Sequence, residues 1–166
     1  MAGITLKGNK VKTIGNIPAI GAKAPDFKLV NKDLAEVSLG DYVGKRKILN
    51  IFPSLDTPVC ARSVRSFNKE AASLKDTVVL NISADLPFAH KRFCAVEAIE
   101  NAEALSTFRS SFARDYNVEI VDSPLAGLCS RVVIVLDKSN EVIYSEQVQE
   151  IANEPKYAEA IEVLKD

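Results

Sequence analysis

The sequence predicts an α/β fold in which a mixed central sheet is flanked by helices and preceded by an added N-terminal β-hairpin. Apolar stretches of strand length alternate with stretches whose apolar residues recur every three or four positions, which is the period of a helix. Near the end of the chain, two apolar strands follow each other across a short turn, and a last helix comes after them. Because short turns join antiparallel strands and helices join parallel ones, the sheet must be mixed.

Length and composition favour one globular domain spanning residues 1–166. A chain of 166 residues with 47% apolar residues is long enough to bury about 70% of its unfolded surface. Its hydrophobic core can therefore stabilise the fold without disulfides or a structural metal ion. Residues 1–16 are assigned to the hairpin extension of that domain.

Charge and hydropathy exclude several classes of function. The net charge is −1 and no block of basic residues is present, so we expect no binding to nucleic acid or to an anionic membrane. No apolar run approaches the roughly 20 residues of a membrane span, and the N-terminus lacks the layout of a signal peptide. Three widely spaced cysteines are not a secreted disulfide framework, so the expected location is the reducing cytoplasm.

Two short strand pairs are expected at the start of the chain. Residues 4–6 and 11–14 alternate around Gly8-Asn9, a dipeptide that suits a two-residue hairpin turn. Residues 27–30 and 36–39 form a second pair across a polar turn.

The middle of the chain alternates strands and helices. A helical turn within 40–45 precedes an apolar strand at 47–52. The next helix is indicated by apolar residues at three- and four-residue steps: Val64, Phe67, Ala71 and Leu74. An apolar strand at 77–83 follows, and then two helices are expected near 88–98 and 103–111.

The C-terminal part is predicted to close the sheet. Strands are expected at 118–121, 131–136 and 142–147, with a hairpin turn at 138–140. Asn153 is a candidate N-cap for a last helix. The apolar side of that helix carries Tyr157, Ala158, Ile161 and Leu164.

Cys60 lies where the strand 47–52 gives way to the first turn of a helix. There, free backbone N–H groups and the positive end of the helix dipole favour thiolate over thiol. Arg62, Arg65 and Lys69 add positive charge on nearby turns. The alternative is a small apolar residue packed at a helix start, and the pattern alone leaves both interpretations open.

The residues just before this cysteine favour chemistry. Pro53, Thr57 and Cys60 reproduce the P-x-x-x-T-x-x-C signature of peroxiredoxins, which are thiol enzymes that reduce hydroperoxides. A proline lacks an N–H and shields the sulfur from water, while a threonine one turn earlier offers a hydroxyl to a thiolate or a peroxide oxygen. The alternative is a strand-to-helix loop rich in Pro, Asp and Thr without catalytic function.

A second stretch, Asp85-Leu86-Pro87-Phe88-Ala89-His90-Lys91-Arg92-Phe93-Cys94, resembles the D-L-P-F-A-x-x-R-F-C segment of bacterial thiol peroxidases, the atypical two-cysteine peroxiredoxins. The resemblance covers nearly the whole chain and implies a thioredoxin-like fold. It also implies that Cys60 is the peroxidatic cysteine and Cys94 the resolving one, joined in an intrachain disulfide after oxidation. Arg131 stands at the position of the active-site arginine of the family, although a strand-end arginine more often reaches for solvent.

The resemblance further implies an activity. The expected reaction is the thiol-dependent reduction of alkyl hydroperoxides and hydrogen peroxide to alcohol or water, in antioxidant defence. Thioredoxin is the implied reductant and a homodimer the implied assembly, with no metal, haem or flavin cofactor. Apolar residues expected around the site, among them Leu55, Phe88 and Phe93, are compatible with an apolar substrate.

The remaining cysteine and the single histidine depart from the family pattern. Cys129 stands where an apolar residue is usual, so we expect a buried small hydrophobe beside a strand. His90 stands where an amide is usual, and an exposed helix residue is favoured over a proton shuttle. The three cysteines and His90 have the ligand types of a zinc site, but such sites bring ligands in close pairs, and these cysteines are some 34 residues apart.

Two other functions fit the same residues. A redox sensor would oxidise the same cysteines and present the changed conformation to a partner. A non-catalytic binding module of thioredoxin fold would not need Cys60 at all.

Overall fold

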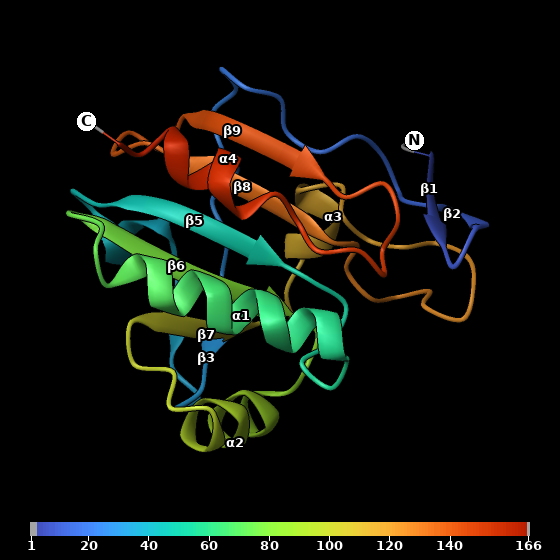
Figure 1. The fold of residues 1–166 in the computed structure, drawn as a ribbon, viewed down its shortest axis with the longest axis horizontal. Coiled ribbons are helices and arrows are strands. Elements are labelled where there is room, and N and C mark those ends of the chain that lie inside the picture. The colour runs from blue at the N-terminus through green and yellow to red at the C-terminus, as the bar shows by residue number, and fades with distance from the viewer. Residues whose placement is uncertain (1–2, 166) are drawn as a thin grey trace.

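The computed structural model describes residues 3–165, apart from the side chain of Ala71, and is organised around a seven-stranded mixed sheet (Figure 1). The strand order is β4-β3-β7-β6-β5-β8-β9. The strands are β3 (Leu29–Asn31), β4 (Glu36–Val37), β5 (Arg46–Ile51), β6 (Thr77–Ser83), β7 (Ala102–Ser106), β8 (Val132–Leu136) and β9 (Val142–Gln147). β5, β6 and β7 are parallel to one another, whereas β8, β9, β3 and β4 pair antiparallel, so the predicted mixed sheet is confirmed.

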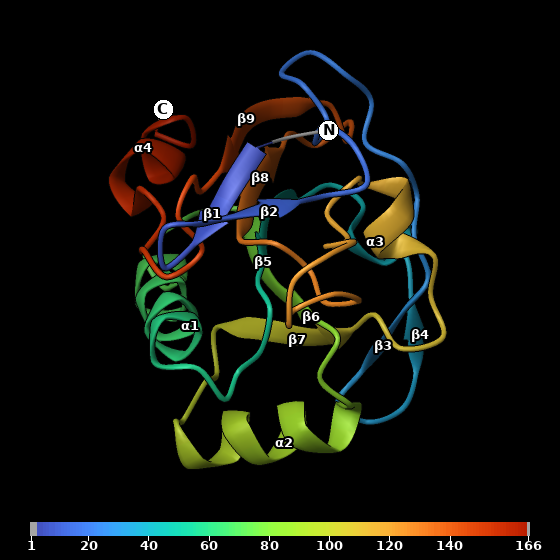
Figure 2. The ribbon, with the colours of Figure 1, turned by 90° about the vertical axis from the view of Figure 1, so that its right-hand side faces the viewer.

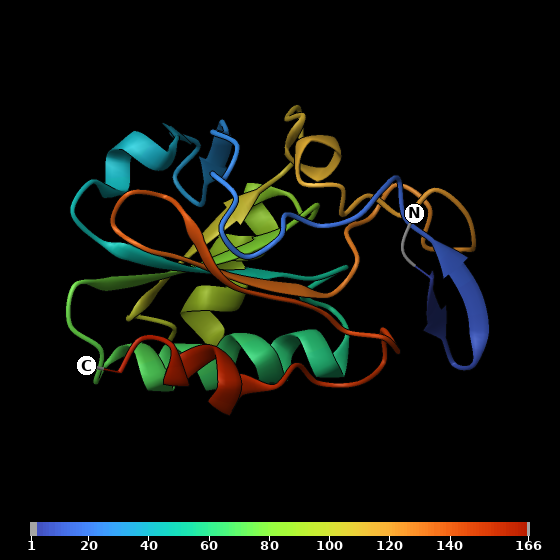
Figure 3. The ribbon, with the colours of Figure 1, turned by 90° about the horizontal axis from the view of Figure 1, so that it is seen from above.

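Helices cover both faces of this sheet. They are η1 (Leu39–Tyr42), α1 (Pro58–Ala71), α2 (Pro87–Val96), α3 (Phe112–Asp115) and α4 (Tyr157–Glu162). α1 and α4 lie on one face, and η1 and α3 lie on the other (Figure 3). α2 packs along β7 (Figure 2). Within residues 3–165, no helix has the length and apolar character needed to cross a membrane.

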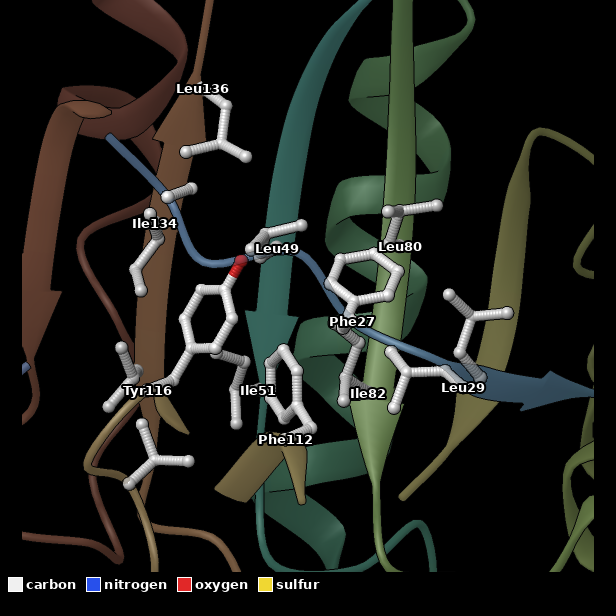
Figure 4. Close-up of a cluster of buried hydrophobic side chains, with 14 of the residues drawn as sticks. Phe27, Leu29, Leu49, Ile51, Leu80, Ile82, Phe112, Tyr116, Ile134 and Leu136 are labelled. Atoms are coloured by element: carbon white, nitrogen blue, oxygen red, sulfur yellow. The ribbon is translucent and has the colours of Figure 1, made fainter. Parts of the chain in front are cut away.

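The larger core lies between the sheet and the η1–α3 face (Figure 4). Strand residues alternate, so Leu49 and Ile51 point into this core while Ile48 points to the opposite face. Phe112 packs edge-on against Phe27, with ring centroids 5.7 Å apart. On the α1–α4 face, a second core joins Phe67 of α1 to Tyr157, Ile161 and Leu164, as the helical period predicts. The prediction was wrong for Ala158, which is exposed, because Ala160, three residues after Tyr157, faces this core instead.

The predicted N-terminal hairpin is present as β1 (Gly3–Leu6) and β2 (Asn9–Lys12), while residues 1 and 2 of the predicted extension lie outside the described residues. Its turn is Lys7-Gly8 instead of Gly8-Asn9, since Leu6 pairs with Asn9. Both turn residues have positive φ, 50° and 83°, which a two-residue turn between twisted strands requires. The hairpin lies beyond the sheet, at the end where β5 finishes (Figure 1).

The predicted helix at 103–111 is wrong, because this segment supplies β7 and a loop. Ala102–Ser106 is rich in good helix formers, yet it pairs with both β6 and β3 and buries Ala104 and Leu105 on opposite faces. Tertiary packing overrides the local preference here.

Two smaller C-terminal predictions also need correction. Residues 118–121 form only isolated bridges, Thr13–Ile120 and Glu119–Cys129, and no strand. Asn153 is not the N-cap of the last helix, because it lies in a turn in which its N–H donates to the Glu150 carbonyl. Lys156 occupies the N-cap position and makes no side-chain capping hydrogen bond.

Candidate active site

Cys60 is the third residue of α1 and is fully buried. Thr57 is the N-cap with extended backbone, and Pro58 opens the helix with its fixed φ. The first-turn N–H groups of a helix have no partner within the helix, so those of Val59 and Cys60 are available near the sulfur. The predicted position at a helix start is therefore confirmed.

Arg131 contacts the sulfur directly. Its Nη2 donates a hydrogen bond to Cys60 Sγ at 3.1 Å, and its Nε donates to the Ile151 carbonyl at 2.8 Å. The side chain is 2% exposed, and Nη1 is buried without a hydrogen-bond partner. Arg131 reaches this place because β8 pairs with β5 in a register that sets Val132 opposite Ile51.

The other predicted cations do not share this role. Arg62 forms an ion pair with Glu154 at 3.6 Å, and Arg65 forms one with Glu97 at 3.3 Å. Both arginine side chains are nearly half exposed, so solvent weakens their field at the sulfur. Among these cations, the guanidinium of Arg131 is the one hydrogen-bonded to the thiol.

A buried polar chain fixes the first turn of α1 against the sheet. Ser63 Oγ donates to the Cys60 carbonyl at 2.8 Å. Asn50 Nδ2 in turn donates to Ser63 Oγ at 3.2 Å and to Asn81 Oδ1 at 2.9 Å. Strands β5 and β6 thus fix the position of the Cys60 backbone relative to the sheet.

An apolar cavity of about 290 Å³ lies beside this site. Pro53, Thr57 and Arg131 line it together, so the structure brings these predicted residues to one place. The rest of the lining is mostly apolar and comprises Leu6, Lys7, Ser54, Pro58, Val59, Leu125, Leu128, Ile151 and Ala152. Of the apolar residues expected around the site, Leu55 belongs to the same buried cluster as Cys60, and Phe93 packs against that cluster. Phe88 is 66% exposed, so the expectation was wrong for this residue. None of the three is among the residues that line this cavity.

Glu150 attaches the N-terminal hairpin to the wall of this cavity. Its carboxylate accepts hydrogen bonds from the N–H groups of Ala152 and Gly8, both at 2.9 Å. These bonds hold the pKa of Glu150 at about 2. The adjacent Ile151 carbonyl holds Arg131, so one short segment positions both the hairpin and the guanidinium.

Cys94 lies on α2 and shares a buried apolar cluster with Cys60. The cluster consists of Phe52, Leu55, Cys60, Val64, Cys94, Ile99 and Ala104. Both thiols are free, and Cys94 lines a second cavity of about 390 Å³ that does not include Cys60. Burial raises the pKa of the Cys94 thiol, and the positive charge of Lys32 opposes that effect.

Cys129 is buried in the larger core, as predicted. Burial raises the pKa of its thiol to about 12, and the charges of Glu119 and Asp85 act in the same direction. A thiol in this environment behaves as a small hydrophobe.

His90 is fully buried, so the predicted exposed position was wrong. Because α2 begins at Pro87, residues 87, 90 and 94 face the protein, whereas Phe88 and Val96 face solvent. His90 Nε2 lies 3.2 Å from Ser83 Oγ, whose own proton is donated to Asp85. Nε2 therefore carries the proton, while Nδ1 is buried without a partner.

Sequence analysis assigned no role to Asp85, although it opens the stretch that ends at Cys94. Its carboxylate accepts from Ser54 Oγ and from the Leu55 N–H, both at 2.8 Å. The signal in the sequence was a carboxylate two residues after a buried strand. Its partners Ser54 and Leu55 are about 30 residues away in the chain, so the sequence could not identify them.

Within residues 3–165, no group of three or more His, Cys, Asp or Glu side chains is arranged to hold a metal ion. The three cysteines and His90 accordingly do not converge on one point. Cys129 belongs to the core on the opposite face of the sheet from the cluster of Cys60 and Cys94.

Comparisons with known proteins extend over the whole chain. A family model described as Redoxin matches residues 19–161. Thiol peroxidases of Mycobacterium bovis and Mycobacterium tuberculosis are each 51% identical to this chain over 164 residues, 99% of both sequences. The crystal structure of a peroxiredoxin-like protein from Aquifex aeolicus superposes with a TM-score of 0.93 at 36% identity, covering 99% of this chain and 96% of that one. A thiol peroxidase from Chromobacterium violaceum, at 24% identity, has the same fold with a TM-score of 0.88 and covers 98% of this chain and 94% of that one.

The buried His90 predicts a pH-dependent loss of stability. Burial lowers the pKa of His90 to about 4, against an ordinary value of about 6.5, and the Asp85 charge only partly opposes this. The unfolded state therefore binds a proton before the folded state does, and stability falls as the pH drops from about 6.5 towards 4. Between pH 7 and pH 5, His90 is expected to cost about 2 kcal/mol of unfolding free energy.

The measurement is urea unfolding at several pH values for the wild type and His90→Gln. Because other groups also titrate, the quantity of interest is the difference between the two proteins. That difference should shift in favour of the glutamine variant as the pH falls. Parallel curves would show that His90 does not contribute to the acid sensitivity.

Proposed function

This chain belongs to the Redoxin family and is a thiol-dependent peroxidase, and we propose that Cys60 is its peroxidatic cysteine and Cys94 its resolving cysteine. The observation that carries the assignment is the hydrogen bond from Arg131 Nη2 to Cys60 Sγ, beside an apolar cavity lined by Pro53, Thr57 and Arg131. The guanidinium stabilises a thiolate, and the cavity gives a hydroperoxide a place to bind against it.

In the first step, the Cys60 thiolate attacks the terminal oxygen of ROOH. An S–O bond forms as the O–O bond breaks, which leaves a sulfenic acid on Cys60 and an alkoxide that takes up a proton and departs as ROH. The sulfur is oxidised by two electrons and the peroxide is reduced. Pro53 limits the access of water, while Arg131, the Thr57 hydroxyl and the first-turn N–H groups hold the peroxide oxygens.

Ionisation of a thiol does not by itself produce a peroxidase. When the pKa of a thiol falls from about 8.5 to about 6, the thiolate fraction at pH 7 rises about 30-fold, but each thiolate becomes about 13-fold less nucleophilic. The net gain is about twofold. The remaining acceleration must come from donors that stabilise the charge on the departing oxygen, as the guanidinium beside the cavity is placed to do.

In the second step, the Cys94 thiolate attacks the sulfenic sulfur of Cys60. An S–S bond forms, the S–O bond breaks and water leaves. A disulfide requires the two Cα atoms to lie within about 7 Å of each other. Both thiols are buried, that of Cys60 against Arg131 and that of Cys94 beside a different cavity. If the two Cα atoms lie farther apart, the start of α1 and the segment around Cys94 unwind locally before the sulfurs meet.

A dithiol protein then reduces the disulfide through a mixed disulfide and so completes the cycle. Thioredoxin is the proposed reductant, a homodimer the proposed assembly and the reducing cytoplasm the proposed location. The apolar lining of the cavity favours alkyl hydroperoxides over hydrogen peroxide.

Replacing each cysteine separates the steps. Cys60→Ser is expected to lose all peroxide reduction, because the attacking sulfur is gone. Cys94→Ser is expected to keep a single turnover but to lose recycling, which is followed as NADPH consumption with thioredoxin and its reductase. Loss of the first turnover in Cys94→Ser would contradict this division of roles, and one stoichiometric oxidation of the wild type would indicate a sensor instead.

Arg131→Ala should slow the first step by about 10²- to 10³-fold, since it removes the donor at the reacting sulfur. Stopped-flow measurement of sulfenic acid formation in Cys94→Ser protein gives this rate. Arg62→Ala is the matched control, because its side chain pairs with Glu154 at the surface and the rate should stay within about twofold. A rate unchanged in Arg131→Ala would remove this residue from the site.

Leu128→Asn tests the substrate preference, because Leu128 contributes an apolar side chain to the cavity wall. The KM for a bulky apolar substrate such as cumene hydroperoxide should rise about tenfold, which corresponds to losing about one buried branched side chain. The rate with hydrogen peroxide should stay within about twofold, since so small a molecule gains little from the wall. Equal losses for both substrates would contradict a preference set by this cavity.

A further inference from the structure

The Asp85 carboxylate lies between the two segments that carry Cys60 and Cys94. It accepts hydrogen bonds from Ser54 Oγ and the Leu55 N–H, both at 2.8 Å, and from Ser83 Oγ at 2.5 Å. Within the described part of the chain, it forms no ion pair with a lysine or arginine. Its charge is therefore stabilised by hydroxyl and amide donors on two different segments.

On one side, these bonds organise the loop that leads into α1. Ser54 Oγ accepts from the Asp56 N–H at 3.1 Å. The Ser54 carbonyl accepts from the Thr57 N–H at 3.3 Å and from the Thr57 hydroxyl at 3.1 Å. Because Asp85 fixes Ser54, it also positions Thr57, which is the N-cap of the Cys60 helix and one of the residues that line the cavity.

On the other side, the same carboxylate is linked to α2. Ser83 Oγ donates to Asp85 and accepts from His90 Nε2, one helical turn before Cys94. The Asp85 carbonyl accepts from Ser106 Oγ at 2.6 Å, which fixes this residue to β7. Asp85 also directly precedes Leu86, the N-cap of α2.

We propose that Asp85 is a positioning residue that holds the Cys60 loop and the start of α2 in the arrangement that reacts with peroxide, and that its bonds to the loop break when the two cysteines join. The inference rests on the roles proposed for Cys60 and Cys94. If it is correct, loss of the Asp85 carboxylate should slow sulfenic acid formation on Cys60 and speed disulfide formation with Cys94. The first step needs Thr57 and the first turn of α1 held in place, whereas the second needs the same segments released.

The test is Asp85→Asn, which keeps the size of the side chain but cannot accept from all three donors. Sulfenic acid formation is measured by stopped flow in a Cys94→Ser background. Disulfide formation is measured with Cys94 present, at hydrogen peroxide concentrations at which the rate no longer depends on peroxide, so that the second step alone sets the rate. The first rate should fall about tenfold or more, and the second should rise several-fold. A variant that was merely less stable than the wild type would not speed one step while slowing the other, so this pattern distinguishes a positioning role from general destabilisation.

Asp137→Asn is the matched control. Asp137 accepts from the Ser139 and Glu141 N–H groups at 2.8 and 2.9 Å, in the β8–β9 turn at the opposite end of β8 from Arg131. Both rates should match the wild type in this variant. An unchanged first step in Asp85→Asn, slowing of both steps together, or the same pattern in Asp137→Asn would each overturn the proposal.

Ser54→Ala keeps the proposal testable if Asp85→Asn does not fold. It removes one donor to the carboxylate and should give the same opposite changes at smaller size, and their absence would overturn the proposal. Cys60→Ser distinguishes this inference from the proposed function. If Cys60→Ser still reduces peroxide, the proposed function fails, whereas an inactive Cys60→Ser with wild-type rates in Asp85→Asn and Ser54→Ala refutes only the role of Asp85.

Discussion

The hydrogen bond between the Arg131 guanidinium and the Cys60 sulfur is the interaction on which the site depends. Burying an arginine is costly unless its donors are hydrogen-bonded. Arg131 is 2% exposed, and its Nη2 donates to the thiol and its Nε to the Ile151 carbonyl, while Nη1 is buried without a partner. The pairing of β8 with β5 brings Arg131 to the end of β5, and the segment around Glu150 supplies the second acceptor. The sheet, the C-terminal segment and the N-terminal hairpin therefore all contribute to one contact.

The two reactive thiols share one apolar cluster but have different environments. Arg131 Nη2 lies within hydrogen-bond distance of the Cys60 sulfur, whereas burial raises the pKa of Cys94. Burial therefore disfavours the thiolate of Cys94 for as long as this thiol stays in the cluster. In the proposed cycle, local unwinding would remove that penalty. The two environments thus favour reaction of Cys60 with peroxide before attack by Cys94.

Much of the site could be predicted because it is local in the sequence. Pro53, Thr57 and Cys60 belong to one strand–loop–helix segment, and the end of β5 and the start of α1 fix their relative positions. What could not be predicted depends on tertiary contacts. β7 is a strand because it lies between β6 and β3, although its residues favour a helix. The burial of His90 likewise follows from the residue at which α2 begins.

The polar groups around Cys60 also limit how much of the chain would have to unwind in the proposed cycle. Ser63 is held by Asn50 in the sheet, so α1 is anchored one turn beyond the cysteine and can keep that anchor when the Cys60 carbonyl leaves Ser63. On the preceding side, the Asp85 carboxylate holds Ser54 until the proposed release of that bond. On the Cys60 side, the proposed unwinding therefore extends only from Ser54 to Ser63. A short mobile segment costs little ordering entropy when it refolds, which suits a catalyst that must return to its reactive arrangement after every turnover.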